Sequence, residues 1–198
     1  MTLLSPRLIR GEERGATTME FALIAPVLLV MVMGLFDLGY VMYTNSMLEG
    51  AIHKAARDST IEGSTSRSAE IDRRVEEAVK AVVLHSTVAF SRKSYASFSD
   101  VARPEDFTDI NNDGACNAGE PFEDSNGNGS WDQDRGNSGQ GGARDAVLYT
   151  VTVTYDRPFP VANLIGQDET FSLKSQTVLR NQPYGMQAVA QPTMGNCA

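Results

Sequence analysis

The chain has 198 residues, which is enough for one domain and a membrane anchor, and 41% of them are hydrophobic. Its formal net charge is −8, and the acidity is local, because residues 105–134 carry nine Asp or Glu and no Lys or Arg. Nucleic-acid binding needs clustered Lys and Arg against phosphate, so we expect no nucleic-acid partner.

The first predicted element is a membrane-spanning helix over residues 16–43. Residues 21–36 read FALIAPVLLVMVMGLF, sixteen residues without a charge, between Glu20 and Asp37. About seventeen residues of helix span roughly 26 Å, close to the roughly 30 Å hydrocarbon core of a bilayer. A buried core helix and a cleaved secretory signal are the alternatives. The length of the run disfavours the first, and the absence of a small-residue cleavage site after it disfavours the second.

The orientation of this helix follows from the basic residues on either side of it. Arg7, Arg10 and Arg14 precede the span, and the next Lys or Arg is Lys54. Positive residues stay on the cytoplasmic side. We therefore expect a single pass with the N-terminus in the cytoplasm and the bulk of the chain outside it.

The start of the span resembles a type IV prepilin processing site. The residues that carry the resemblance are RGATTMEFALIAPVLL, in which a short basic leader ends in Gly15 and Glu20 follows five residues later. The resemblance implies that a prepilin peptidase removes residues 1–15 by cutting between Gly15 and Ala16. It also implies that Glu20 pairs with the new amino group of a neighbouring subunit. The alternative is an ordinary signal anchor in which Glu20 is an interfacial charge.

A longer segment, residues 14–63, resembles the TadE-like proteins. The matching features are MEFAL, APVLL, Asp37 with Gly39, and AARD with Gly63, and SQTVLRNQPY near the C-terminus is also similar. The resemblance implies a pseudopilin or minor pilin of a Tad (Flp-type) pilus system in the bacterial inner membrane. Its partners would be other pilin-like subunits and the assembly machinery, with the bulk of the chain periplasmic or extracellular.

Residues 44–104 are predicted to form the helical part of an outer domain. The first helix should continue to about Arg57, where Gly63 and the Ser/Thr-rich residues 64–68 stop it. A second helix is predicted over residues 69–84, since Ile71, Val75, Val79 and Val82 recur on one face.

Antiparallel strands are predicted within residues 143–182. Residues 147–155 alternate strictly between two faces with β-branched and aromatic side chains, a strong strand pattern, and residues 171–180 form a weaker one. A third strand is expected near residues 94–101, and residues 183–198 are expected to be an irregular tail. The predicted fold class is therefore α+β, a long N-terminal transmembrane helix followed by a small pilin-like outer domain with an antiparallel sheet.

An acidic insertion and linker, residues 105–142, contain a pattern typical of calcium loops. Residues 109–120 read DINNDGACNAGE, which fits D-x-[DN]-x-[DN]-G-x5-E. The predicted ligands are Asp109, Asn111, Asp113, the backbone carbonyl of Ala115, Asn117 and Glu120.

A partial copy of this pattern, DSNGNGSWDQDR, begins fifteen residues later. Its predicted ligands are Asp124, Asn126, Asn128, Ser130 and Asp132. Arg135 stands at position 12 and cannot bind a cation, so Asp134 or another carboxylate would have to complete the site. We expect Ca²⁺ to bind weakly, with a Kd of roughly 10⁻⁴–10⁻³ M, and to fold residues 105–135. The alternative is a flexible acidic loop.

The two cysteines, Cys116 and Cys197, allow one disulfide in an oxidising compartment. Such a bridge would join the tail to the first calcium loop. The alternative is a buried free thiol and a disordered tail.

Nothing in the sequence indicates an enzyme. The two histidines, His53 and His85, are isolated, and the chain contains no Gly-x-Ser-x-Gly, P-loop, HExxH or Cys–His pattern. We therefore expect no catalytic activity and no small-molecule substrate. The leading hypothesis is a structural pilus subunit, and the alternative is an unprocessed, membrane-anchored module for calcium-dependent binding or adhesion.

Overall fold

The structure is a computed structural model that describes residues 14–60, 68–117, 119–164, 166–181, 186–187 and 191–198. Most of the predicted leader, residues 1–13, and the predicted helix stop at residues 63–67 lie outside the described residues. The chain divides into two compact units. The anchor unit contains residues 1–43 and 156–170, and the sheet unit contains residues 44–155 and 171–198.

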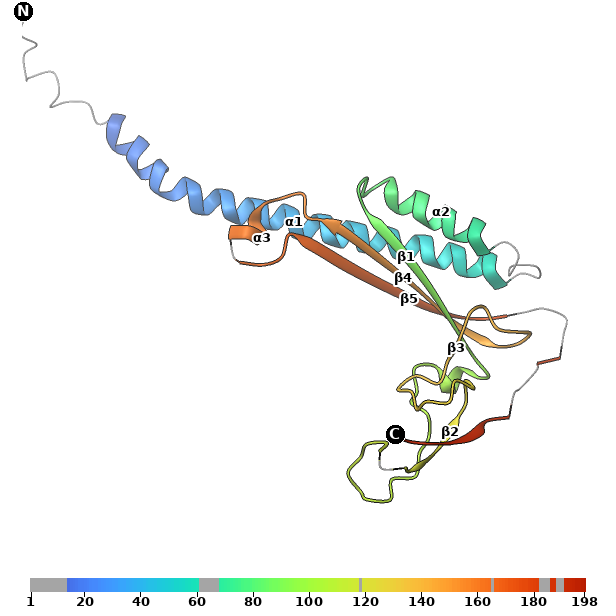
Figure 1. Cartoon of the computed structure of the whole chain (residues 1–198). Coiled ribbons are helices and arrows are strands. Elements are labelled where there is room, and N and C mark those ends of the chain that lie inside the picture. Colours follow the sequence, from blue (N-terminus) through green and yellow to red (C-terminus); the bar gives the residue numbers. More distant parts are fainter. Residues whose placement is uncertain (1–13, 61–67, 118, 165, 182–185, 188–190) are drawn as a thin grey trace, which may run out of the picture. The chain divides into compact units, whose positions relative to one another are not determined.

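The long helix α1 spans Arg14–Thr60, 47 residues with Pro26 inside it, and it contains the predicted transmembrane segment (Figure 1). Large apolar side chains in its N-terminal half are exposed, for example Leu23 at 81% and Leu35 at 71%. Among the described residues, α1 is the one helix long and apolar enough to cross a membrane. Such exposure is unfavourable in water, so α1 suggests a single-pass membrane anchor.

The sheet unit is built on four strands in the order β3-β1-β4-β5. These are β1 (Thr87–Tyr95), β3 (Asn137–Ser138), β4 (Ala146–Asp156) and β5 (Thr170–Arg180). Strand β1 runs antiparallel to both β3 and β4. The C-terminal part of α1 and the helix α2 (Ser68–Lys80) lie along the same side of this sheet (Figure 1).

The core of the sheet unit is the face of β4 that its sequence alternation predicts. Residues 147, 149, 151, 153 and 155 are each at most 3% exposed. The buried residues of the two helices recur at helical spacing: Leu48, Ile52 and Ala55 in α1, and Ile71, Val75 and Val79 in α2. Burying one apolar face of each element is the main stabilising contribution here. The prediction of a long apolar helix followed by a sheet-rich α+β domain is thus confirmed.

One polar cluster joins α2 to the sheet. The guanidinium of Arg92 donates two hydrogen bonds to Asp72, at 2.8 and 2.6 Å, and lies 4.4 Å from the centre of the Tyr149 ring. The hydroxyl of Tyr149 donates to the same carboxylate at 2.7 Å. Burial, and then the hydrogen bond to Asp72 and the negative charge of that carboxylate, raise the pKa of Tyr149.

The predicted third strand was placed too late in the chain. The structure has β1 at Thr87–Tyr95, paired with β4 over nine positions, and the short 3-10 helix η3 at Phe98–Asp100. Arg92 occupies a half-buried position of β1 because Asp72 neutralises it, and a charged residue there interrupts the apolar alternation that marks a strand.

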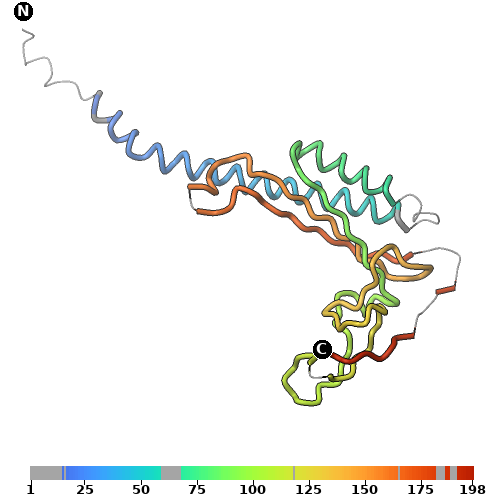
Figure 2. The backbone as a smooth tube through the Cα atoms, viewed as in Figure 1, coloured from blue at the N-terminus to red at the C-terminus, as the bar shows by residue number. Residues whose placement is uncertain are grey.

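The irregular tail predicted for residues 183–198 was also wrong in part. Residues Thr193–Asn196 form β6, which runs antiparallel to β2 (Pro121–Asp124) in a separate two-stranded sheet (Figure 2). Phe122 in β2 is 1% exposed and packs against Gly195, where an added Cβ would lie 2.5 Å from its ring. The strand depends on this distant partner, and a local pattern does not reveal it.

Candidate functional site

The first acidic loop, residues 109–120, wraps around its own carboxylates. Positive φ angles at Asn112 (60°) and Gly114 (77°) turn the chain sharply. The carboxylate of Asp109 accepts hydrogen bonds from the backbone amides of Asp113 (3.2 Å) and Gly114 (2.9 Å). Its side chain therefore points to the inside of the turn.

Three further predicted side chains meet at this point. Asn111 Oδ1 accepts from the amide of Asp113 at 2.9 Å, and the side-chain amides of Asn111 and Asn117 donate to Asp113 Oδ2 at 3.0 and 2.7 Å. Hydrogen bonds from Asn117 and then from the backbone of Ala115 hold the pKa of Asp113 below its ordinary value. The loop thus gathers carboxylate and amide oxygens, the donors that calcium prefers.

Glu120, the last residue of the first acidic loop, is only 2% exposed and binds backbone amides of the loop. Its Oε1 accepts from the backbone amides of Ile110 (2.8 Å) and Asn111 (3.3 Å), and its Oε2 accepts from Asn117 (3.2 Å). The last residue of the loop therefore binds the amides at positions 2, 3 and 9.

The second acidic loop, residues 124–135, repeats this geometry. Positive φ angles fall at Gly127 (74°) and Gly129 (80°), the same positions 4 and 6. Asp124 accepts from the amides of Gly127, Asn128 and Gly129 at 2.6, 3.2 and 2.8 Å. Asn128 Oδ1 accepts from Ser130 at 2.8 Å, as Asp113 accepts from Ala115 in the first acidic loop at 2.8 Å.

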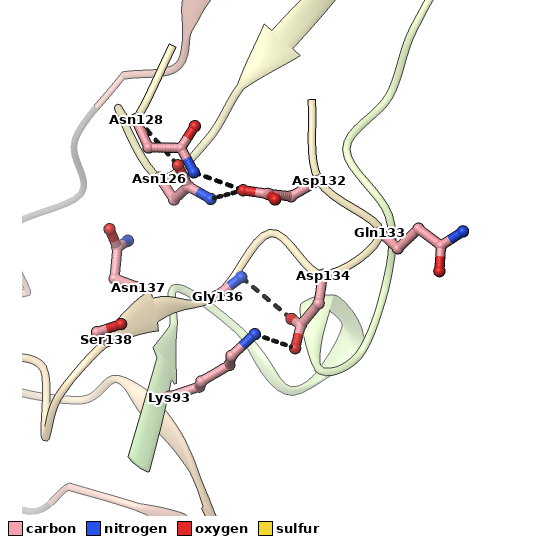
Figure 3. Close-up of a pocket in the computed structure, with 9 residues that line it drawn as sticks. All are labelled: Lys93, Asn126, Asn128, Asp132, Gln133, Asp134, Gly136, Asn137 and Ser138. Atoms are coloured by element: carbon pink, nitrogen blue, oxygen red, sulfur yellow. Dashed lines mark hydrogen bonds and ion pairs between the residues drawn. The ribbon is translucent and has the colours of Figure 1, made fainter. Parts of the chain in front are cut away.

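The side chains of the second acidic loop converge on Asp132. The amides of Asn126 and Asn128 donate to Asp132 Oδ2 at 2.8 and 2.6 Å, as Figure 3 shows. A polar cavity of about 450 Å³ lies beside them, with Lys93 on its opposite side.

Asp134, which the sequence offered to complete this loop, is bound elsewhere. It accepts from Lys93 Nζ at 2.8 Å and from the amide of Gly136 at 3.2 Å (Figure 3). It also accepts from the Tyr95 hydroxyl at 2.9 Å. Burial raises the pKa of Asp134, but the hydrogen bonds from Lys93 and Tyr95 outweigh it, so that the pKa lies below its ordinary value. These contacts direct Asp134 away from the loop.

Glu105 supplies the carboxylate that the second acidic loop lacks at position 12, where Arg135 stands. It is 1% exposed, and it accepts from the amides of Ser125 (2.8 Å) and Asp132 (3.1 Å). These amides stand at positions 2 and 9 of the second acidic loop, like those that Glu120 binds in the first. Arg135 instead donates to the carbonyl of Pro104 and so holds the residue before Glu105 against the loop.

Sequence reasoning missed Glu105 because it precedes both loops in the chain. The available signal was indirect: a loop without its position-12 carboxylate, and an unassigned glutamate four residues before Asp109. Glu105 reaches the amides of Ser125 and Asp132 only when the chain is folded.

One short sheet connects the two acidic loops, and a disulfide joins the first of them to the C-terminal segment. Strand β2 begins directly after Glu120 and ends at Asp124, so it connects the loops. Cys116 and Cys197 form a disulfide with a Cα–Cα distance of 5.4 Å. The backbone of Cys197 also exchanges hydrogen bonds with the loop end, accepting from Gly119 at 3.0 Å and donating to Glu120 at 2.8 Å.

The predicted processing residues lie at the opposite end of the chain. Gly15 and Glu20 are exposed on the first turns of α1, and Ala16 lies between them in the same helix. In the described part of the chain, no group of three or more His, Cys, Asp or Glu side chains is arranged to hold a metal. A cation in either acidic loop would therefore depend on asparagine and backbone oxygens as well as on carboxylates.

Comparison with known proteins bears on the N-terminal segment. The model of the TadE-like protein family matches residues 15–57, from the predicted cleavage site to the part of α1 in the sheet unit. No curated protein and no solved structure was found to match the chain. Residues 15–57 are thus similar to the TadE-like proteins, as the resemblance in the sequence indicated.

Proposed function

We propose that this protein is a pseudopilin or minor pilin that acts as a structural subunit of a Tad-type pilus or related secretion apparatus. Its anchor would lie in the bacterial inner membrane, with the sheet unit on the periplasmic side. The TadE-like match supports a role in pilus assembly. A disulfide between Cys116 and Cys197 supports an oxidising compartment for the sheet unit. No catalytic role is proposed.

The observation that carries this proposal is the exposed apolar surface of α1 within the family match. Leu23, Met31 and Leu35 are 81%, 69% and 71% exposed. Such a surface must contact lipid or other apolar helices. Helices of like subunits fit it, and the exposed carboxylate of Glu20 at its start would need a positive partner in an apolar setting, where charge is unfavourable.

Processing by a prepilin peptidase is tested by the mass of the mature, membrane-extracted protein. We expect the chain to begin at Ala16, and we expect Gly15→Phe to block the cut because a small residue must precede it. A matched control, Thr18→Ser, should leave processing intact. A wild-type chain that starts at Met1 would contradict the proposal and leave the membrane-anchored, calcium-dependent binding module as the better account.

We further propose that each acidic loop binds one Ca²⁺, which stabilises the sheet unit. The first site would use Asp109, Asn111, Asp113, the carbonyl of Ala115, Asn117 and Glu120. The second would use Asp124, Asn126, Asn128, the carbonyl of Ser130, Asp132 and Glu105. The support is the repeated geometry: in each loop one buried glutamate accepts hydrogen bonds from the backbone amides at positions 2 and 9. Each of these carboxylate groups has at least one oxygen that accepts no more than one hydrogen bond, and that oxygen retains a lone pair for a cation.

The assignment of Glu105 can be tested with Tb³⁺, which replaces Ca²⁺ and luminesces when a nearby tryptophan is excited. Trp131, the single tryptophan, lies in the second acidic loop and donates to the Glu105 carbonyl at 2.8 Å. We expect two bound calcium ions and a strong Tb³⁺ signal in the wild type. Glu105→Gln should lose one ion and the signal, whereas Glu120→Gln should lose one ion and keep the signal.

The control for this experiment is Glu123→Gln, which removes an exposed carboxylate from β2 between the two loops. It should change neither the number of ions nor the Tb³⁺ signal. If Glu105→Gln behaves like Glu123→Gln while its circular dichroism is unchanged, Glu105 is not a ligand.

A further inference from the structure

The segment between β4 and β5, residues 157–169, is bound to the end of the apolar run of α1. Arg157 forms an ion pair with Asp37, which is 6% exposed. The ring of Phe159 stacks on Phe36 with their centres 6.2 Å apart and an angle of 28°. Both contacts lie within the anchor unit, so α1 and this segment are placed together (Figure 1).

These contacts place the segment near one boundary of the hydrocarbon core of a bilayer that α1 crosses. Phe36 is the last of the sixteen uncharged residues, and Asp37 follows it directly. Sixteen helical residues span about 24 Å, so the ends of the run lie near the two boundaries of a roughly 30 Å hydrocarbon core. A carboxylate at that depth needs a partner, and Arg157 supplies the positive charge.

The tip of the segment presents apolar side chains to its surroundings. Pro158 and Pro160 are exposed, and Leu164, the last residue of α3 (Val161–Leu164), is 66% exposed. Val161 and Ala162 at the start of α3 are buried. The tip is closed on itself by hydrogen bonds from Gly166 to the Asn163 carbonyl and from Gln167 to the Ala162 carbonyl, at 3.3 and 2.9 Å.

The base of the segment has the opposite character. Asp156 accepts from the Thr170 hydroxyl at 3.2 Å, and Asp168 and Glu169 are exposed. Glu169 also accepts a hydrogen bond from Asn163 of α3. An apolar tip above an acidic base suits an interface between water and neutral lipid, and the acidic groups disfavour anionic headgroups.

We propose that residues 157–169 form a second membrane contact, in which the tip places Leu164 and the two prolines in the bilayer interface beside α1. This tip contacts the lipid leaflet that holds the C-terminal end of the membrane-spanning segment of α1. The contact continues the lipid-facing surface of α1, because Phe36 is 62% exposed and stacks on Phe159. This inference requires that α1 spans a membrane and does not require assembly into a pilus.

The test uses the full chain in phosphatidylcholine vesicles at a low ratio of protein to lipid. Leu164→Cys is labelled with an environment-sensitive nitrobenzoxadiazole fluorophore while the native disulfide stays oxidised. The matched control is Ile110→Cys, which has 67% exposure against 66% for Leu164 but lies in the first acidic loop. We expect the Leu164 probe to emit at shorter wavelength and to be quenched by lipids that carry a nitroxide, and the Ile110 probe to show neither effect.

The added substitution Arg157→Gln should release the segment, so that the Leu164 probe loses its quenching. Emission equal to that of the Ile110 probe would overturn the proposal. So would a shift to shorter wavelength without nitroxide quenching, because protein would then cover Leu164. Quenching that survives Arg157→Gln would show that the Asp37 ion pair does not hold the segment at the membrane.

Discussion

Removing calcium should lower the melting temperature of the sheet unit by about 10–20 °C. A ligand present at a hundred times its Kd stabilises the folded state by about 2.7 kcal/mol, so two sites contribute about 5 kcal/mol. For a chain of this size, each kcal/mol corresponds to about 2–4 °C. Without the ions, the nine acidic groups of residues 105–134 would repel one another and oppose closure of both acidic loops.

Two measurements, a thermal melt and a separate limited proteolysis, are each made in EDTA and in about 10 mM calcium. This calcium concentration is about a hundredfold above a Kd of about 10⁻⁴ M. In EDTA, at a temperature below the lowered melting temperature, we expect cleavage within residues 109–135 while β1, β4 and β5 remain protected, since the sheet unit is then still folded. Magnesium serves as a control, because it prefers a smaller octahedral site. A melting temperature and a cleavage pattern that EDTA leaves unchanged would refute calcium stabilisation.

A feature of this fold could be predicted from the sequence when the residues that form it lie close together in the chain. The apolar run of α1 and the alternation of β4 are local periodicities, and both predicted the observed element. The first acidic loop is also local, since all of its predicted side chains lie within twelve residues and meet in the structure. Such features can be read from one segment without knowing the fold.

The features that were missed depend on partners far away in the chain. Strand β1 contains Arg92, whose place in the sheet depends on Asp72, twenty residues earlier. Strand β6 depends on Phe122, and the second acidic loop depends on Glu105, which lies nineteen residues before Asp124. A charged residue in a strand or an unassigned glutamate has no local signature until folding brings its partner beside it.

Loss of the disulfide should destabilise the sheet unit by about 4.5 kcal/mol, the chain-entropy estimate for a loop of this size. Cys116 and Cys197 are 81 residues apart, so the bridge removes much freedom from the unfolded chain. We expect Cys116→Ser, Cys197→Ser and the double variant to lose equal stability in urea unfolding, because each removes the same bond. Ala198→Ser, at the exposed neighbouring position, is the control and should match the wild type.

Loss of the disulfide should also weaken calcium binding in the first acidic loop more than in the second. Cys197 donates to the carbonyl of Glu120, whose side chain lies beneath the first acidic loop, whereas the second is held by Glu105. In Cys197→Ser we therefore expect weaker calcium binding at the first site and an unchanged Tb³⁺ signal from Trp131. Equal weakening at both sites would mean that the bridge acts through β2 as a whole. If alkylation without reductant modifies both wild-type cysteines, no bridge forms and neither effect should appear.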